Sequence, residues 1–287
     1  MYRHARLSAI LLAAIIISGC ATIPLIDNRY NAAEEIARTA RLERSYIKSG
    51  SFTLTVFSRI EKPGDPVTIY IEGDGFAYRD RFRISMDPTP INSVALHLAA
   101  IDPSPNVAYI GRPGQYCRGE VPDCNQAYWT AKRFSEEVIR SIGETVSDVK
   151  RTAGSGEVSL VGFSGGGAVV CLIAARRNDI ASIRTVAGNL DTDAVNVFHK
   201  ASKFEDSLNP VDIAPCLVGI PQRHFIGGHD TVIPPSIAHN FAKASSDFRN
   251  KTITIVPDAE HNKGWAERWK ELLKTPPVKP SAVKVED

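Results

Sequence analysis

Short apolar runs rich in β-branched residues alternate along the chain with segments whose apolar residues recur at helical spacing. Several of the short runs are continuously apolar, as strands buried on both faces of a parallel sheet are. The pattern predicts strands at residues 52–57, 67–71, 107–110, 158–161, 183–186, 224–226 and 253–256. It predicts helices at residues 31–44, 93–101, 129–149, 166–177, 236–244 and 265–273. Because strands and helices alternate, we expect one α/β domain with a largely parallel sheet.

The first twenty residues differ from the rest of the chain. Arg3 and Arg6 precede an uncharged, almost wholly apolar run at residues 7–17, a combination typical of a secretory signal. The segment Ile17-Ser18-Gly19-Cys20 resembles the bacterial lipobox, whose cysteine is acylated and becomes the mature N-terminus. The alternative is an uncleaved anchor at residues 7–26, which carries no charge. Either interpretation predicts an exported and tethered protein.

Four regions follow from these patterns. We expect a lipoprotein signal peptide at 1–19, a lipidated tether with a short helix at 20–48, the folded domain at 49–273 and a flexible, proline-rich tail at 274–287. Ala21 stands where an aspartate would signal retention in the inner membrane. A Gram-negative cell would therefore carry the protein on its outer membrane, facing the periplasm.

The composition excludes two classes of protein. The chain is 43% hydrophobic and 23% charged, which excludes a wholly disordered protein. Its 34 basic and 32 acidic residues are too evenly balanced for a dedicated nucleic-acid-binding protein. Removal of the signal takes away two basic residues and no acidic ones, so we expect the lipid alone to hold the protein on the membrane.

The five cysteines agree with export. With Cys20 assigned to the lipid, the other four allow three pairings, of which we favour Cys117–Cys124 across a loop of turn-forming residues. Cys171 lies in an apolar helical pattern and is expected to be a buried thiol. No CxxC pair or histidine cluster suggests zinc, and we expect neither a metal nor a cofactor.

A G-x-S-x-G motif joins a predicted strand to a predicted helix. Gly162 and Gly166 allow the two elements to pass close together, and Ser164 is then held in a strained conformation with its hydroxyl exposed. The N–H group of Gly165 would face a developing oxyanion. The alternatives are a glycine-rich turn without a ligand or an anion-binding helix start. No Gly-Lys-Ser/Thr follows, which disfavours a P-loop.

A nucleophilic serine needs a base, and the base needs an orienting acid. Asp230 and His261 each come just after a predicted strand, so a parallel sheet would bring them to the same edge as Ser164. Asp191 is a rival acid, whereas Asp258 is expected to be a solvated loop charge, like Glu260. The other histidines are expected to be packing or surface residues, or lie in the signal.

A second oxyanion donor is expected in the loop after the strand at 67–71, which reads Glu72-Gly73-Asp74-Gly75-Phe76. The backbone N–H of Asp74 is the candidate, and the alternative is a simple glycine turn. Because a carboxylate would repel an oxyanion, we expect the Asp74 side chain to point away or to pair with a cation.

These motifs together resemble the α/β-hydrolase superfamily. More narrowly, the loop at 70–75, the segment at 162–167 and Gly227-Gly228-His229-Asp230 are similar to those of poorly characterised bacterial α/β hydrolases that are often lipoproteins. The resemblance covers about residues 50–273 and departs from the family at Glu72, which replaces a histidine. It implies the α/β-hydrolase fold, with a mostly parallel sheet of about eight strands, flanking helices, a nucleophile elbow, a small cap and no metal.

The natural place for the cap is the segment at 189–221. Its Phe198, Phe204 and Leu208 would either line an acyl pocket or belong to the ordinary core. Because the segment is short, we expect a fairly open site and a substrate with a short to medium acyl chain.

The sequence as a whole predicts a membrane-tethered serine hydrolase that cleaves esters or related acyl compounds with Ser164, His261 and Asp230. Acyl transfer or peptide hydrolysis would use the same nucleophile. The alternative from another class is a non-catalytic envelope binding or assembly lipoprotein on the same scaffold. The expected partners are a small-molecule acyl substrate and the membrane, with no nucleic acid; the sequence identifies no protein partner.

Overall fold

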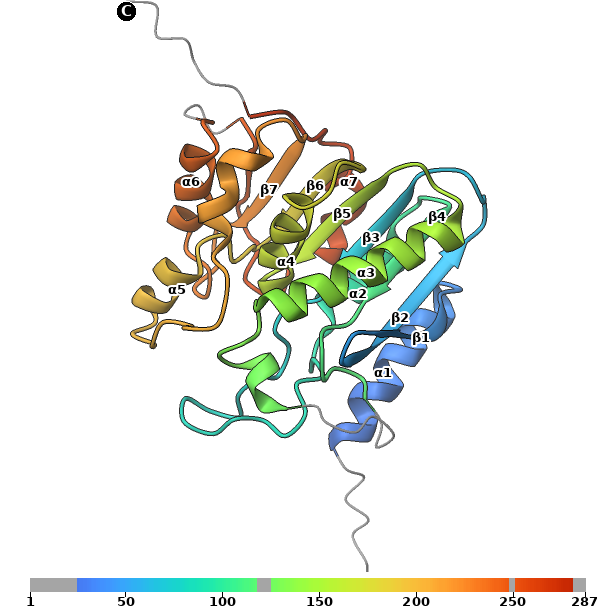
Figure 1. Ribbon diagram of the computed structural model, residues 1–287, viewed down its shortest axis with the longest axis horizontal. Coiled ribbons are helices and arrows are strands. Elements are labelled where there is room, and N and C mark those ends of the chain that lie inside the picture. Colours follow the sequence, from blue (N-terminus) through green and yellow to red (C-terminus); the bar gives the residue numbers. More distant parts are fainter. Residues whose placement is uncertain (1–24, 118–124, 248–250, 281–287) are drawn as a thin grey trace, which may run out of the picture.

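An eight-stranded sheet forms the centre of the molecule, in a computed structural model that describes residues 25–117, 125–247 and 251–280 (Figure 1). The strand order is β1-β2-β4-β3-β5-β6-β7-β8. Strand β2 runs antiparallel to β1 and β4, and the remaining neighbours are parallel. The strands are β1 (Glu43–Ser49), β2 (Phe52–Ile60), β3 (Val67–Ile71), β4 (Asn106–Ile110), β5 (Val158–Phe163), β6 (Ile180–Val186), β7 (Gln222–Gly227) and β8 (Ile253–Val256).

Helices cover both faces of this sheet, as parallel strands buried on two sides require. One face packs against α1 (Leu25–Thr39), α2 (Val94–Ile101) and α7 (Trp269–Leu272). The opposite face packs against α3 (Glu136–Ala153), α4 (Gly165–Ala174) and α6 (Pro235–Ala244). The remaining elements are the short helix α5 (Thr192–Phe198) and the 3₁₀ turns η1 (Gln126–Trp129), η2 (Pro210–Leu217) and η3 (Ala266–Arg268).

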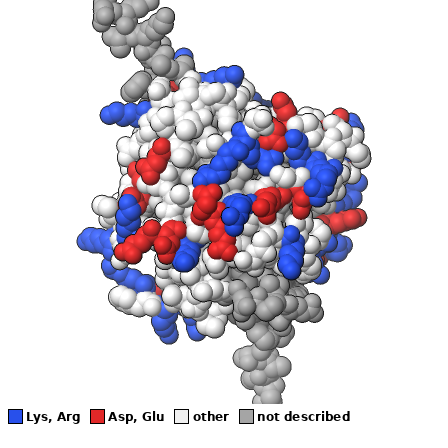
Figure 2. All heavy atoms as spheres, viewed as in Figure 1, with Lys and Arg blue, Asp and Glu red and all other residues white. Residues whose placement is uncertain are grey.

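The surface carries mixed charge. On the face shown in Figure 2, basic and acidic side chains are interspersed over most of the area, in keeping with the net charge of +2. Within the described ranges no helix has the length and apolar character needed to cross a membrane.

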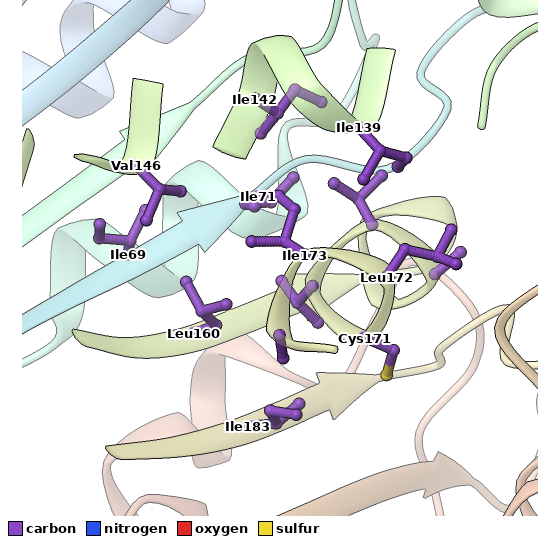
Figure 3. Packing of buried hydrophobic residues seen from close by; sticks show 14 of the residues in the cluster. Ile69, Ile71, Ile139, Ile142, Val146, Leu160, Cys171, Leu172, Ile173 and Ile183 are labelled. Carbon is purple, nitrogen blue, oxygen red and sulfur yellow. The ribbon is translucent and has the colours of Figure 1, made fainter. Parts of the chain in front are cut away.

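The larger core cluster lies between the sheet and helices α3 and α4 (Figure 3). In Figure 3, Ile69 of β3 lies beside Val146 of α3 and Ile71 of β3 lies near Ile142, and all four are fully buried. Burying a side chain of this size contributes about 1.5–3 kcal/mol, so these side chains hold α3 against β3, the strand that pairs with β5. Cys171 of α4 is buried here as expected, and its burial raises the pKa of the thiol.

Several element boundaries differ from the expectations. The sheet begins with β1, most of which lies in the region that the sequence assigned to the tether. The sequence did not predict this strand because its side chains are mostly exposed and polar. The helix expected from 129 starts only at Glu136, where the Ser135 hydroxyl accepts the Val138 N–H. In the expected flexible tail, Val278 pairs with Gln222 beside β7.

Some predictions fall outside the described residues. They are the signal at 1–19, the acylated Cys20, the Cys124 half of the disulfide and the tail at 281–287. Lipid attachment and the Cys117–Cys124 bond therefore stay predictions.

Candidate active site

Ser164 occupies the turn between β5 and α4 in a backbone conformation that side chains rarely adopt, with φ of 50° and ψ of −119°. The glycines on either side make this turn possible. A Cβ on Gly162 would lie 2.3 Å from the Gly166 carbonyl oxygen, and a Cβ on Gly166 would lie 2.2 Å from the Ile71 carbonyl oxygen. Strand, turn and helix therefore cross at a distance that only glycine permits, and the crossing leaves the serine at the strand end.

Ser164, His261 and Asp230 form a hydrogen-bonded row at the carboxyl edge of the sheet. The distance from His261 Nε2 to Ser164 Oγ is 3.0 Å, and that from His261 Nδ1 to Asp230 Oδ2 is 2.9 Å. The first residue follows β5, the second follows β8 and the third follows β7, so the parallel topology brings together residues that are up to 97 positions apart.

The Asp230 carboxylate is held from the other side as well. Its Oδ1 accepts the backbone N–H groups of Val232 and Ile233 at 2.8 and 2.9 Å, and its side chain has no exposed surface. The His261 ring lies 5.2 Å from the Phe163 ring, centroid to centroid. With Nδ1 protonated, the imidazole donates to Asp230 and its Nε2 is free to accept the serine proton.

The rival acid Asp191 has another role. It caps α5, where its Oδ1 accepts the Ala194 N–H at 3.1 Å and an N–H of the Asn209 side chain at 3.1 Å.

The loop after β3 passes directly against the serine. A Cβ on Gly73 would lie 3.2 Å from Ser164 Cβ, and a Cβ on Gly165 would lie 2.1 Å from Asp74 Oδ1. The N–H group of Gly165 is at the first position of α4, where a helix leaves its N–H groups without an intrahelical partner. The two residues named as candidate oxyanion donors therefore lie beside Ser164.

The Asp74 side chain pairs with two cations. Its carboxylate lies 2.6 Å from Arg133 Nη1 and 3.3 Å from Arg112 Nη1. Burial by itself would raise the pKa of Asp74, but the two guanidinium groups outweigh it and the pKa lies below its usual range. The carboxylate beside the serine is thus neutralised, as the sequence led us to expect. The arginines themselves were missed, although Arg112 follows the end of β4 and so lies at the same sheet edge.

Glu72 lies buried under this loop. It accepts the Gly73 N–H at 2.9 Å and the Tyr109 hydroxyl at 3.1 Å. Burial raises the pKa of Glu72 to about 7, although these hydrogen bonds act in the opposite direction. The glutamate therefore supports the backbone of the loop that runs past Ser164.

A cleft of about 530 Å³ opens over the serine. Loops that follow β3, β5, β7 and β8 form its walls, and the lining residues include Asp74, Phe76, Ile91, Phe163, Val232 and Asn262. This size falls within the range of small-molecule sites. Among the described residues, no group of three or more His, Cys, Asp or Glu side chains is placed to hold a metal ion.

The expected cap segment contributes no side chain to this lining. Phe204 and Leu208 pack against the core, and Phe198 is 53% exposed. Of the two alternatives for these residues, core packing holds for Phe204 and Leu208. The long loop after β3 walls the cleft instead.

Comparison of the whole chain identifies similar folds but no close relative. No protein-family model matches the sequence, and no curated protein matches it significantly. An acylaminoacyl peptidase from Pyrococcus horikoshii superposes with a TM-score of 0.58 at 12% identity, over 84% of this chain and 42% of the peptidase. The present chain thus spans less than half the length of that enzyme.

Two similar structures match over nearly their full length. An alpha-beta serine hydrolase homologue from Coxiella burnetii superposes with a TM-score of 0.53 at 15% identity, over 81% of this chain and 94% of the homologue. Est1E from Butyrivibrio proteoclasticus gives a TM-score of 0.54 at 15% identity, over 80% and 96% respectively. Together with the strand order and the elbow at Ser164, these similarities show that the chain has the fold of the α/β-hydrolase superfamily.

Proposed function

We propose that the protein is a serine hydrolase that cleaves esters or related acyl compounds through an acyl-enzyme. The observation that carries this proposal is the hydrogen-bonded row of Ser164, His261 and Asp230, of which Ser164 and His261 line the cleft. A strained serine, a base within hydrogen-bond distance of it and a buried acid on the far side of that base are the parts that acyl transfer requires.

In the first half of the reaction, Ser164 Oγ attacks the carbonyl carbon of the ester. His261 Nε2 takes the hydroxyl proton, and the resulting imidazolium is stabilised by the adjacent Asp230 carboxylate. Collapse of the tetrahedral intermediate breaks the bond to the alcohol oxygen, which receives the proton from His261. The acyl group remains on Ser164.

The negative oxygen of the intermediate would accept the backbone N–H groups of Gly165 and Asp74. Loss of one such donor typically costs about 10²–10³ in rate, so this contribution is comparable to that of the base. The Asp74 carboxylate lies close to this oxygen, and its two arginine partners, Arg112 and Arg133, offset its repulsion.

In the second half, water attacks the acyl carbon and His261 acts as the base for it, which releases the acid and restores the serine. The cleft is moderate in volume and is walled by loops, which favours an acyl chain of short to medium length. Transfer to another alcohol, or attack on an amide, would use the same residues and differ only in the acceptor or the bond.

The proposal includes export and attachment to the membrane through an acylated Cys20. The first described helix begins at Leu25, five positions later, so little chain would separate a lipid at Cys20 from the folded domain. A Cys20→Ser protein that no longer incorporates radiolabelled palmitate, unlike the native one, would support this attachment. Equal incorporation by both proteins would exclude Cys20 as the acylated residue.

Hydrolysis of p-nitrophenyl esters of increasing acyl length tests the activity. The native protein and a Ser236→Ala control, which removes an exposed serine of α6, should turn over the short esters. Ser164→Ala should lose at least about a thousandfold in rate. A rate that keeps rising beyond about twelve acyl carbons would contradict the proposed chain length, given the cleft volume.

A further inference from the structure

Exposed apolar side chains gather in one loop beside the cleft. Residues 76–92, here called the rim loop, follow β3 and include five of the ten large hydrophobic residues that are exposed in the described chain. Phe82 and Met86 are 87% and 80% exposed, and Ile91, which also lines the cleft, is 63% exposed. The other two are Tyr78 and Ile84. Such a concentration of exposed apolar surface marks a surface that contacts a partner or a membrane.

The same loop is basic. It contains Arg79, Arg81 and Arg83, against the acids Asp80 and Asp87. Asp87 pairs with Arg29 of α1 at 3.0 Å, which leaves the rim loop with an excess of positive charge. In Figure 2, the lower left of the molecule, where Figure 1 places this loop, shows mainly basic and uncharged atoms. Apolar residues interleaved with arginines suit an anionic lipid surface, which attracts basic side chains electrostatically.

The start of the described chain is joined to this loop. Arg29, only 7% exposed, donates to the Thr89 carbonyl oxygen and lies 5.6 Å from the centre of the Phe76 ring, in addition to its ion pair with Asp87. Figure 1 shows the start of α1 and the rim loop at the same end of the molecule, below the carboxyl edge of the sheet. Any attachment of the preceding residues to a membrane would therefore bring this end toward it.

The length of the intervening chain limits how far away that membrane would lie. Leu25 lies five positions after Cys20, and a fully extended chain covers at most about 3.6 Å per residue, or about 18 Å over this span. A lipid on Cys20 would thus keep the bilayer surface within about 18 Å of the start of α1, at the end of the molecule that carries the rim loop (Figure 1).

We propose that the rim loop is a membrane-contact surface that binds a bilayer of anionic phospholipid. Phe82 and Met86 enter the boundary between headgroups and acyl chains, and Arg79 and Arg81 contact the lipid phosphates. The bilayer contact turns the mouth of the cleft toward the lipid, because Ile91 belongs to the rim loop and also lines the cleft. This proposal also revises our expectation that the acyl group on Cys20 holds the protein on the membrane by itself. Attachment through an acyl group is strengthened by a second membrane contact. This contact rests on the proposed tether and is independent of catalysis by Ser164.

Depth-dependent fluorescence quenching tests the contact on the full-length protein in vesicles of phosphatidylethanolamine and phosphatidylglycerol. Phe82→Trp places a reporter at the tip of the rim loop. Lys62→Trp is the matched control, since Lys62 is exposed but precedes β3 and so lies at the opposite edge of the sheet. The three native tryptophans are buried and supply a constant background.

Lipids with brominated acyl chains should quench the residue-82 reporter at least roughly twofold more than the residue-62 reporter. Adding Arg81→Gln to Phe82→Trp should reduce this quenching, and so should exchanging phosphatidylglycerol for phosphatidylcholine. Equal quenching at both positions, with protein that floats with the vesicles, would overturn the proposal and leave attachment through the N-terminus alone. Protein that does not float with the vesicles would contradict both the contact and the tether.

Two further results separate this proposal from others. A spectral change at residue 82 that depends on protein concentration but not on brominated lipid would overturn membrane contact in favour of self-association. Fluorophosphonate labelling of Ser164 in the same samples tests the proposed catalysis separately from membrane contact. A failure of one proposal can therefore be distinguished from a failure of the other.

Discussion

Asp230 engages both of its carboxylate oxygens, and this double engagement orients the row that ends at Ser164. Oδ2 accepts from His261, whereas Oδ1 accepts two backbone N–H groups at Val232 and Ile233. The residue therefore holds the imidazole and is itself held. Few substitutions satisfy both sides at once, because every partner of the carboxylate is a donor.

Asp230→Asn is expected to lower kcat on the order of ten-thousandfold. If the amide NH₂ faces His261, the imidazole must accept at Nδ1, and its protonated Nε2 can no longer take the serine proton. If the NH₂ instead faces Val232 and Ile233, donors oppose donors, which costs about 1–3 kcal/mol of folding stability. Ester turnover and urea unfolding measure the two effects. Asp258→Asn, at an exposed carboxylate paired with Arg268, is the control, and equal turnover by the two variants would refute the role of Asp230.

Glu72 is expected to make stability fall as pH rises. Its pKa is about 7 in the folded protein against 4.5 ordinarily, so between these values the folded state binds more protons than the unfolded state. The contribution is fully favourable below about pH 4.5 and is lost once the pH passes about 7, a change of at most about 3 kcal/mol.

Glu72→Gln cannot titrate and provides the comparison for this effect. Urea unfolding from about pH 5 to pH 8 should show the native protein losing stability relative to the variant as the pH increases. Parallel stability curves for the two proteins would mean that Glu72 does not titrate in this range.

At the scale of elements, the site depends on how closely β5, α4 and the loop after β3 cross. The backbone of Gly166 lies against the Ile71 carbonyl, and Gly162 lies against Gly166 itself. Side chains in the core between β5 and helices α3 and α4 then hold these elements at that separation. The position of Ser164 is thus a consequence of packing as much as of the motif.

Gly162→Ala should be strongly destabilising, by about 3 kcal/mol, because its Cβ would lie 2.3 Å from a backbone oxygen and α4 would have to move. Gly156→Ala, just before the same strand, meets nothing within 4 Å and should change stability by less than about 0.5 kcal/mol. Urea unfolding of both variants measures the difference. Two variants of equal stability would show that the crossing tolerates a side chain.

For the molecule as a whole, the sequence predicted the parallel sheet well because its central strands are buried on both faces and read as continuous apolar runs. The strands expected at 67–71 and 253–256 coincide with β3 and β8. The same logic identified the residues that meet at the sheet edge, since Asp230 and His261 each follow a recognisable strand.

The edge strand β1 and the ion pairs around the site could not be predicted from the sequence pattern. Strand β1 lies at the sheet edge and its side chains are mostly exposed. It is therefore recognised by its pairing with β2 and not by an apolar run in the sequence. The pairing of Asp74 with Arg112 and Arg133 joins residues from three loops, and the buried position of Glu72 depends on α2 and β4. These features arise from tertiary contacts that a linear pattern does not encode.

The most direct test of the central proposal is the intact mass of the full-length protein after reaction with a fluorophosphonate, beside Ser164→Ala and the control Ser236→Ala. An activated serine predicts one adduct on the native protein and on the control, and none on Ser164→Ala. A folded native protein without an adduct, or an adduct that persists in Ser164→Ala, would contradict catalysis by Ser164.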